Sequence, residues 1–141
     1  MRNKKIIIMM LAVVVTGFAC AQKPTDQIKA IASQFVEGAD LQKGEMLEEI
    51  LAPESMQYVA MGGKLNKFSS EQYIGLVNAK KLGGKPRSVE FQKAEQIGDK
   101  LGVAVLTATS SEYKFLYQIS MAKDEQDSWK IVGIAAEING I

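Results

Sequence analysis

Apolar residues recur at helical spacing in the first part of the chain. The first predicted helix follows Pro24, where Thr25 can cap it and Asp26 suits the positive end of its dipole. Its apolar stripe consists of Ile28, Ile31, Ala32, Phe35, Val36 and Ala39. Gly38 is expected to loosen or end this helix.

Two further helices are predicted from the same spacing. A short one runs from about residue 43 to 51, where Pro53 blocks its continuation. The other runs from about residue 71 to 82, and Ser69 and Gln72 before and inside it have the spacing of a capping box.

The rest of the chain alternates between apolar and polar positions, which is typical of strands. A short strand is predicted over residues 56–61, and Gly62-Gly63 predicts a hairpin turn into a partner strand at 64–67. Four longer strands follow, over residues 88–97, 101–110, 113–123 and 129–138. Because the turns between these four are short, they are predicted to pair as an antiparallel meander.

The last strand is apolar on both of its faces. Trp129, Ile131, Gly133 and Ala135 alternate along it with Val132, Ile134 and Ala136. We therefore expect this strand inside the sheet, with a cover on each side. A second subunit is one such cover, so we predict a homodimer formed through the sheet faces.

Helices followed by a long meander make an α+β arrangement. A curved antiparallel sheet that wraps three N-terminal helices would form a cone with one open end. A pocket is then expected between the sheet and the helices.

The first 21 residues have the layout of an export signal. A basic start, an apolar run from Ile6 to Val15 and small residues around Ala19-Cys20-Ala21 predict a signal peptide over residues 1–21 and one domain over 22–141. The apolar run is too short to span a bilayer. We predict cleavage before Gln22 and a periplasmic or secreted protein; a lipid anchor on Cys20, as in an outer-membrane lipoprotein, is the alternative.

The amino-acid composition excludes several kinds of binding and catalytic site. Removing the three basic residues of the predicted signal from 17 leaves 14 basic residues against 16 acidic ones, so the net charge of the mature domain is near −2. The sequence has no clustered basic patch of the kind that binds nucleic acid. The chain has no histidine, and its only cysteine is Cys20. Histidine- or cysteine-based catalysis and most zinc sites are thereby excluded, and we expect neither metal nor cofactor.

Three sequence stretches carry a family resemblance. They are Phe35–Gly38 with Leu47–Glu54, Phe68–Ile74, and Asp127–Val132. In order and spacing, residues 25–138 resemble the NTF2-like superfamily, and most closely its putative lumazine-binding branch, which is related to SnoaL-like and ketosteroid-isomerase-like proteins. The chain departs from many relatives at Lys43 and Ala52, where they carry an acid and a histidine. The resemblance implies the cone fold, and its function is argued separately.

Aromatic side chains are the candidates for a pocket lining. Tyr113, Phe115 and Tyr117 share one face of their strand and could stack on a flat ring, or form core or a dimer interface. Tyr58, Tyr73 and Trp129 complete the candidate set, with Trp129 interpreted first as packing against the helices.

An isomerase-like site would need a carboxylate base beside a tyrosine hydroxyl in an apolar pocket. Glu90 and Asp40 are the carboxylates considered, and both are interpreted as exposed surface acids. No catalytic residue is therefore assigned.

Three functions remain open on the sequence. The preferred one is an exported, non-catalytic module that binds a small apolar or aromatic ligand in the cone. The second is an isomerase or dehydratase using a carboxylate and a tyrosine, which an inward acid paired with a tyrosine would favour. The third is a dimeric structural or interaction domain without a small ligand, which a filled cone would favour.

Overall fold

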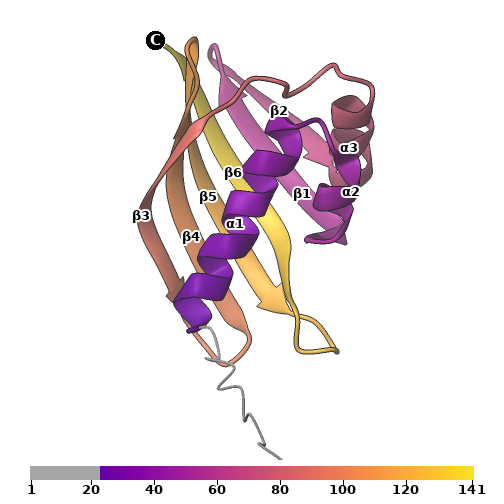
Figure 1. The fold of residues 1–141 in the computed structure, drawn as a ribbon, viewed down its shortest axis with the longest axis vertical. Coiled ribbons are helices and arrows are strands. Elements are labelled where there is room, and N and C mark those ends of the chain that lie inside the picture. Colours follow the sequence, from indigo (N-terminus) through magenta and orange to yellow (C-terminus); the bar gives the residue numbers. More distant parts are fainter. Residues whose placement is uncertain (1–22) are drawn as a thin grey trace, which may run out of the picture.

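Three helices and one curved six-stranded sheet make up residues 23–141, the part of the chain that the computed structural model describes (Figure 1). The elements are α1 (Pro24–Asp40), α2 (Gly44–Glu48), β1 (Leu51–Met61), β2 (Lys64–Ser69), α3 (Ser70–Asn78), β3 (Ser88–Gln96), β4 (Leu101–Thr109), β5 (Tyr113–Lys123) and β6 (Trp129–Gly140). The predicted α+β class is confirmed. The predicted signal peptide and its cleavage site lie outside the described residues.

The strand order across the sheet is β2-β1-β6-β5-β4-β3. The hairpin β1–β2 and the meander β3–β4–β5–β6 are antiparallel, as predicted. The sheet is not antiparallel throughout, however, because β1 pairs in parallel with β6. These two strands are far apart in the chain, so no short turn dictates their direction.

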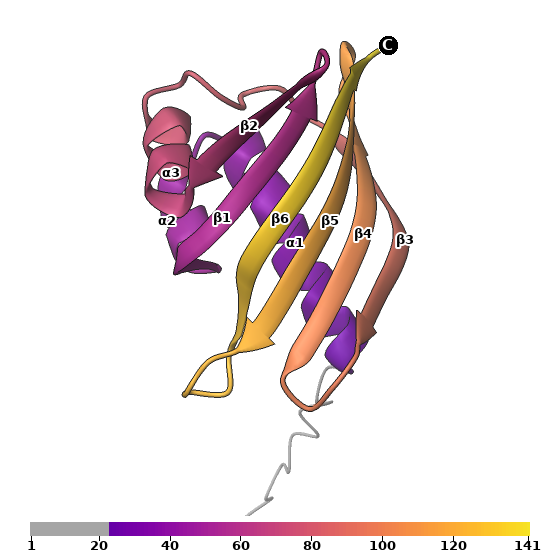
Figure 2. The same cartoon turned by 180° about the vertical axis from the view of Figure 1, so that it is seen from behind.

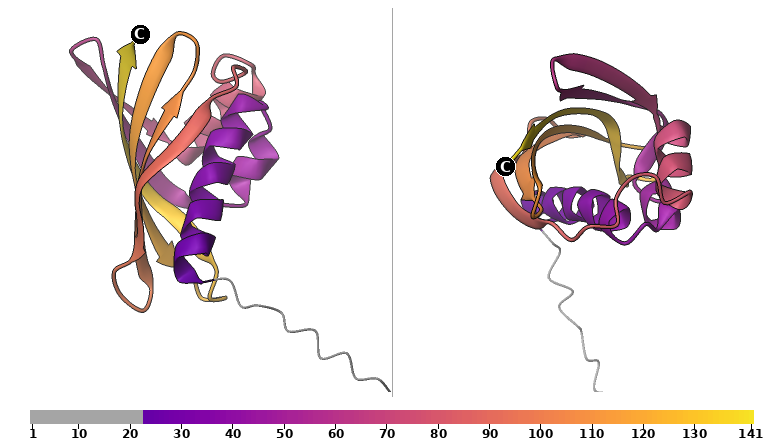
Figure 3. Two further views of the ribbon diagram at one scale, coloured as in Figure 1. Left: turned by 60° about the vertical axis from the view of Figure 1, so that its left-hand side comes forward. Right: turned by 90° about the horizontal axis from the view of Figure 1, so that it is seen from above.

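The helices cover one face of the sheet. Figure 3 shows α1 lying inside the curve of the sheet, with α2 and α3 beside the β1–β2 end. The predicted stripe of α1 faces the sheet, and Ile28, Ala32 and Phe35 are fully buried there. Figure 2 shows the opposite, outer face of the sheet, which none of the described helices covers. None of the helices within residues 23–141 is long and apolar enough to cross a membrane.

Element boundaries differ from the predictions for local reasons. Helix α1 continues through Gly38, which packs so closely on α2 that a Cβ there would lie 2.9 Å from Leu47 Cδ2. Strand β1 starts at Leu51, and Pro53 lies where its register with β6 is irregular. The capping box of α3 is confirmed: Ser69 and Gln72 exchange backbone-to-side-chain hydrogen bonds.

A β-bulge changes which faces of β6 are apolar. Ile131 pairs with Met121 and Gly133 with Ser120, so Val132 is an extra residue that bulges outward and is 43% exposed. Past the bulge the alternation is inverted, and Ile134 and Ala136 face the core with Trp129 and Ile131. The prediction that both faces of β6 are apolar was therefore wrong: one face collects most of the apolar side chains. Its central place in the sheet is confirmed.

Candidate functional site

A cavity of about 350 Å³ lies between the C-terminal end of α1, α3 and the concave face of the sheet. Its wall includes Gln57, Val59 and Met61 of β1, Tyr73 of α3, Asp40 of α1, and alternate residues of β5. The cavity lies on the concave side of the sheet, which curves around α1 (Figure 3). The volume is at the small end of the roughly 300–1,000 Å³ typical of ligand pockets.

Four of the six predicted pocket residues line this cavity: Tyr73, Tyr113, Phe115 and Tyr117. The alternation along β5 brings three of them to the concave face, as the sequence indicated. Whether they touch a ligand stays a prediction.

Tyr58 and Trp129 do not line the cavity. Gln57 and Val59 point inward on β1, so Tyr58 between them points to the outer face, where it is 42% exposed. Trp129 packs at the far end of the cone, where its indole N–H donates to Gln27 Oε1 (3.2 Å). The packing interpretation of Trp129 agrees with this position.

The aromatic wall is internally packed. Phe35, fully buried in α1, stacks on Tyr73 with ring centroids 5.6 Å apart and meets Tyr117 edge-on at 5.5 Å. Phe115 stacks on Tyr117 at 5.9 Å. Such contacts fix ring orientation, so the cavity presents preformed aromatic surface.

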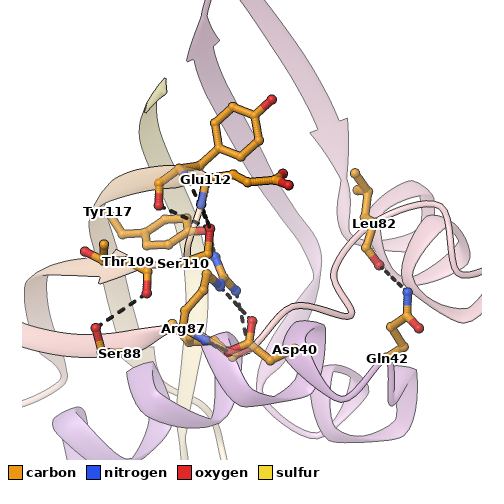
Figure 4. A network of polar contacts seen from close by, with 11 residues as sticks. Asp40, Gln42, Leu82, Arg87, Ser88, Thr109, Ser110, Glu112 and Tyr117 are labelled. Carbon is orange, nitrogen blue, oxygen red and sulfur yellow. Dashed lines mark hydrogen bonds and ion pairs between the residues drawn. The ribbon is translucent and has the colours of Figure 1, made fainter. Parts of the chain in front are cut away.

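An ion pair that the sequence did not indicate forms the polar part of the wall (Figure 4). Arg87 Nε donates to Asp40 Oδ1 (2.7 Å), and the Arg87 backbone N–H donates to Asp40 Oδ2 (3.1 Å). The same guanidinium donates to the Tyr117 hydroxyl (2.7 Å) and lies 4.5 Å from the Phe115 ring centroid. The Arg87 and Asp40 side chains are 6% and 12% exposed. Interpreting Asp40 as an exposed loop acid was therefore wrong.

The loop between α3 and β3 brings Arg87 to this place. Its backbone is tied to the end of α1 by the hydrogen bond from Gly84 N–H to the Ala39 carbonyl (3.1 Å). Gln42 reaches the same loop through its bond to the Leu82 carbonyl (3.1 Å; Figure 4). Glu90, the other carboxylate considered, is exposed on β3, as expected.

Burial governs the protonation of Tyr73 and Tyr117, two of the tyrosines that line the cavity. It raises the pKa of Tyr73, with a further rise from nearby Tyr117. It also raises the pKa of Tyr117, although Arg87 partly opposes this. Burial alone would lower the pKa of Arg87, but Tyr117 and Asp40 outweigh it and the pKa is raised. At physiological pH the hydroxyls of Tyr73 and Tyr117 are therefore neutral, and the Arg87 guanidinium is charged and paired.

This arrangement is better suited to binding than to proton transfer. Both carboxylate oxygens of Asp40 already accept hydrogen bonds from Arg87, whose guanidinium lies between Asp40 and the Tyr117 hydroxyl. A general base must instead reach the substrate proton directly. Among residues 23–141 there is also no cluster of three metal-binding side chains.

Comparisons with known proteins agree with this fold. The model of the family described as "Putative lumazine-binding" matches residues 23–134. An NTF2-like protein of unknown function from Silicibacter pomeroyi is 14% identical with a TM-score of 0.71, covering 81% of this chain and 94% of that one. A ketosteroid isomerase-like protein from Erwinia carotovora is 9% identical with a TM-score of 0.66, covering 83% and 97%. At these identities the likeness concerns the fold alone. A search of curated proteins found none that matches the sequence.

Proposed function

This chain belongs to the putative lumazine-binding family of NTF2-like proteins, and from this membership and the cavity we propose that it is an exported module that binds a small, flat, largely apolar molecule without turning it over. The observation that carries the proposal is the preformed cavity of about 350 Å³ with five aromatic residues in its wall, Phe68 besides the four predicted ones. Flat rings gain dispersion and quadrupole interactions on such a surface. The family description names lumazine, itself a flat bicyclic ring compound.

Two measurements test this function. Denaturing extraction of the purified mature domain, followed by mass spectrometry, should recover a ring compound. Titration with lumazine, followed by its fluorescence, should show saturable binding that Tyr113→Ala weakens about three- to tenfold, since a well-packed aromatic contact contributes about 0.5–1.5 kcal/mol. Tyr113 is chosen because buried Tyr117 also supports the fold through Arg87.

Tyr58→Ala is the matched control. It removes the same side chain from the outer face, away from the cavity, and should leave lumazine binding unchanged. If no ring compound is recovered and no titration saturates, the third function, a structural domain without a small ligand, takes the place of this proposal.

An isomerase function is kept as the second candidate because Asp40 lines the cavity near a tyrosine hydroxyl. It requires Asp40 to leave Arg87 when substrate binds. Exchange of deuterium into the position next to the carbonyl of a bound cyclic ketone, lost in Asp40→Asn, would support catalysis. No exchange above the buffer rate would favour binding alone.

We also propose a homodimer through the outer face of the sheet. Tyr58, Leu116 and Val132 are 41–43% exposed. They belong to β1, β5 and β6, which lie side by side in the sheet (Figure 2). Covering such side chains is favourable. Sedimentation should give twice the monomer mass for the mature domain and the monomer mass for Leu116→Glu; a monomeric wild type would contradict the dimer.

Export is proposed from residues 1–21 of the sequence alone. The intact mass of the exported protein should correspond to a chain beginning at Gln22. A mass that begins at an acylated Cys20 would replace secretion by a lipid anchor.

A further inference from the structure

One side chain in the cavity wall has no explanation in the packing of the protein. The Gln57 side chain belongs to a residue that is only 2% exposed, and its Nε2 has no hydrogen-bond partner among the described residues. No other buried side-chain nitrogen or oxygen within residues 23–141 lacks a partner. Gln57 lies on the concave face of β1 and forms part of the cavity wall.

An unpaired buried amide lowers the stability of the fold. A donor removed from water without a new partner retains its full desolvation cost, whereas an apolar side chain of similar size would avoid that cost. The inward neighbours of Gln57 on β1 are Val59, which is apolar, and Ser55, whose hydroxyl is already paired with Ser70. Neither neighbour supplies a partner for the Gln57 amide, so a group bound in the cavity is the partner that the wall leaves room for.

The chemistry of the partner follows from the amide and its surroundings. A primary amide presents one N–H donor and one carbonyl acceptor side by side, and rotation about its last torsion exchanges the two ends. The group that satisfies both is a second amide-like edge, with a carbonyl next to an N–H. In a flat ring this edge is a lactam.

The charges of the wall favour an uncharged ligand. The positive charge of Arg87 is balanced by Asp40 at 2.7 Å, so this buried pair offers no net charge to an anion. The other charged residues of the wall, Lys81, Lys85 and Glu112, are exposed to solvent, and Lys85 pairs with Glu112. The nearby hydroxyls of Tyr73 and Tyr117 stay neutral because burial raises their pKa. A carboxylate bound against Gln57 would therefore be a buried charge without a buried counter-ion.

We propose that Gln57 recognises the lactam edge, C(=O)–N–H, of a flat, uncharged bicyclic ring held between the aromatic side chains of the cavity. This inference rests on the proposed ring-binding function and adds the chemical class of the ligand and the residue that selects it. Stacking supplies affinity for any flat ring, and the amide separates lactams from rings that lack the polar edge.

The test uses three ring probes of the same size: quinolin-2(1H)-one, which has the lactam edge, quinoline, which lacks it, and quinoline-2-carboxylate, which carries a charge. Isothermal titration of the mature domain should give at least tenfold tighter binding for the quinolone than for either other probe. A ring without the lactam edge leaves the buried Gln57 amide without hydrogen bonds, which weakens its binding.

Two variants locate the selectivity. Gln57→Leu should reduce the preference for quinolone over quinoline to within about twofold, and should melt at the same or a higher temperature because it removes an unpaired buried amide. Gln126→Leu makes the same substitution at an exposed glutamine in the turn between β5 and β6, outside the cavity wall, and should keep the preference.

The outcomes separate the two proposals. If quinoline binds as tightly as the quinolone, or if Gln57→Leu keeps the preference, the ring-binding function stands and the role of Gln57 is wrong. Tightest binding of the carboxylate would overturn the uncharged class. If none of the three probes binds although lumazine does, the proposed lactam selectivity is wrong and the ring-binding function stands; if lumazine does not bind either, both proposals fail.

Discussion

Breaking the buried ion pair between Arg87 and Asp40 should strongly lower the stability of the fold. In Arg87→Met, a side chain of similar length remains, but the Asp40 carboxylate stays in a site where it is only 12% exposed and loses the donor at 2.7 Å. Removal of one partner of a buried pair costs about 3–5 kcal/mol, because the remaining charge is left unsolvated. The Tyr117 hydroxyl loses its donor as well.

The assay is urea unfolding of the mature domain, with thermal melts alongside. At about 3–5 °C per kcal/mol for a domain of this size, Arg87→Met should lower Tm by roughly 10–20 °C. The control is Lys85→Met, which breaks the Lys85–Glu112 pair whose side chains are 57% and 55% exposed. An exposed pair contributes about 0–1 kcal/mol, so Tm should change by only a few degrees.

A double-mutant cycle separates the ion pair from packing. Asp40→Asn combined with Arg87→Met removes both charges. The loss of unfolding free energy in the double variant should therefore be smaller, by about 2 kcal/mol or more, than the sum of the losses in the two single variants. Additive effects, or a loss below about 1 kcal/mol for Arg87→Met, would refute the view that this pair is buried and coupled.

Three further predictions concern single positions. Because folding raises the pKa of Tyr117, its contribution to stability should be constant below about pH 10, where the unfolded tyrosine ionises, and should be lost above it. Urea titrations between about pH 8 and 11 should therefore show a shallower fall for Tyr117→Phe than for the wild type, with the remaining fall due in part to Tyr73, whose pKa is also raised. Gly83 and Gly62 both have positive φ, but an added Cβ would lie 1.9 Å from the Ala39 carbonyl oxygen at Gly83 and would meet nothing within 4 Å at Gly62. Gly83→Ala should therefore lower the free energy of unfolding by well more than the roughly 1 kcal/mol expected for Gly62→Ala. Equal losses for the two variants would contradict the close approach at Gly83. Ser69→Ala removes the capping box of α3 and should cost about 1 kcal/mol by the same assay, with no loss if the cap does not form in solution.

The sequence pattern anticipated the elements well where signals are local. The stripe of α1, the capping box of Ser69, the Gly62-Gly63 hairpin and the meander all depend on residues within a few positions of one another. The aromatic face of β5 was found for the same reason, since period-two alternation holds along an unbroken strand.

The errors arose where that alternation breaks. The bulge at Val132 inverts the faces of β6. The first part of β1, around Pro53, pairs irregularly with β6 and was not predicted as strand. A bulge leaves little trace in a single sequence, because it is defined by the partner strand and not by the bulged residue alone.

By itself the sequence determined the α+β class and the aromatic face that lines the cavity, because both follow from periodicity. Only the tertiary structure decided the charged and polar part of the site. Asp40 and Arg87 are 47 residues apart, and the loop of Gly83 and Gly84 folds back on the end of α1 to join them. The sequence also does not show that Gln57 is buried with its Nε2 unpaired, because this depends on the packing around it. Contacts between distant segments depend on how the sheet curves and where the loops close, and these are properties of the whole packed chain.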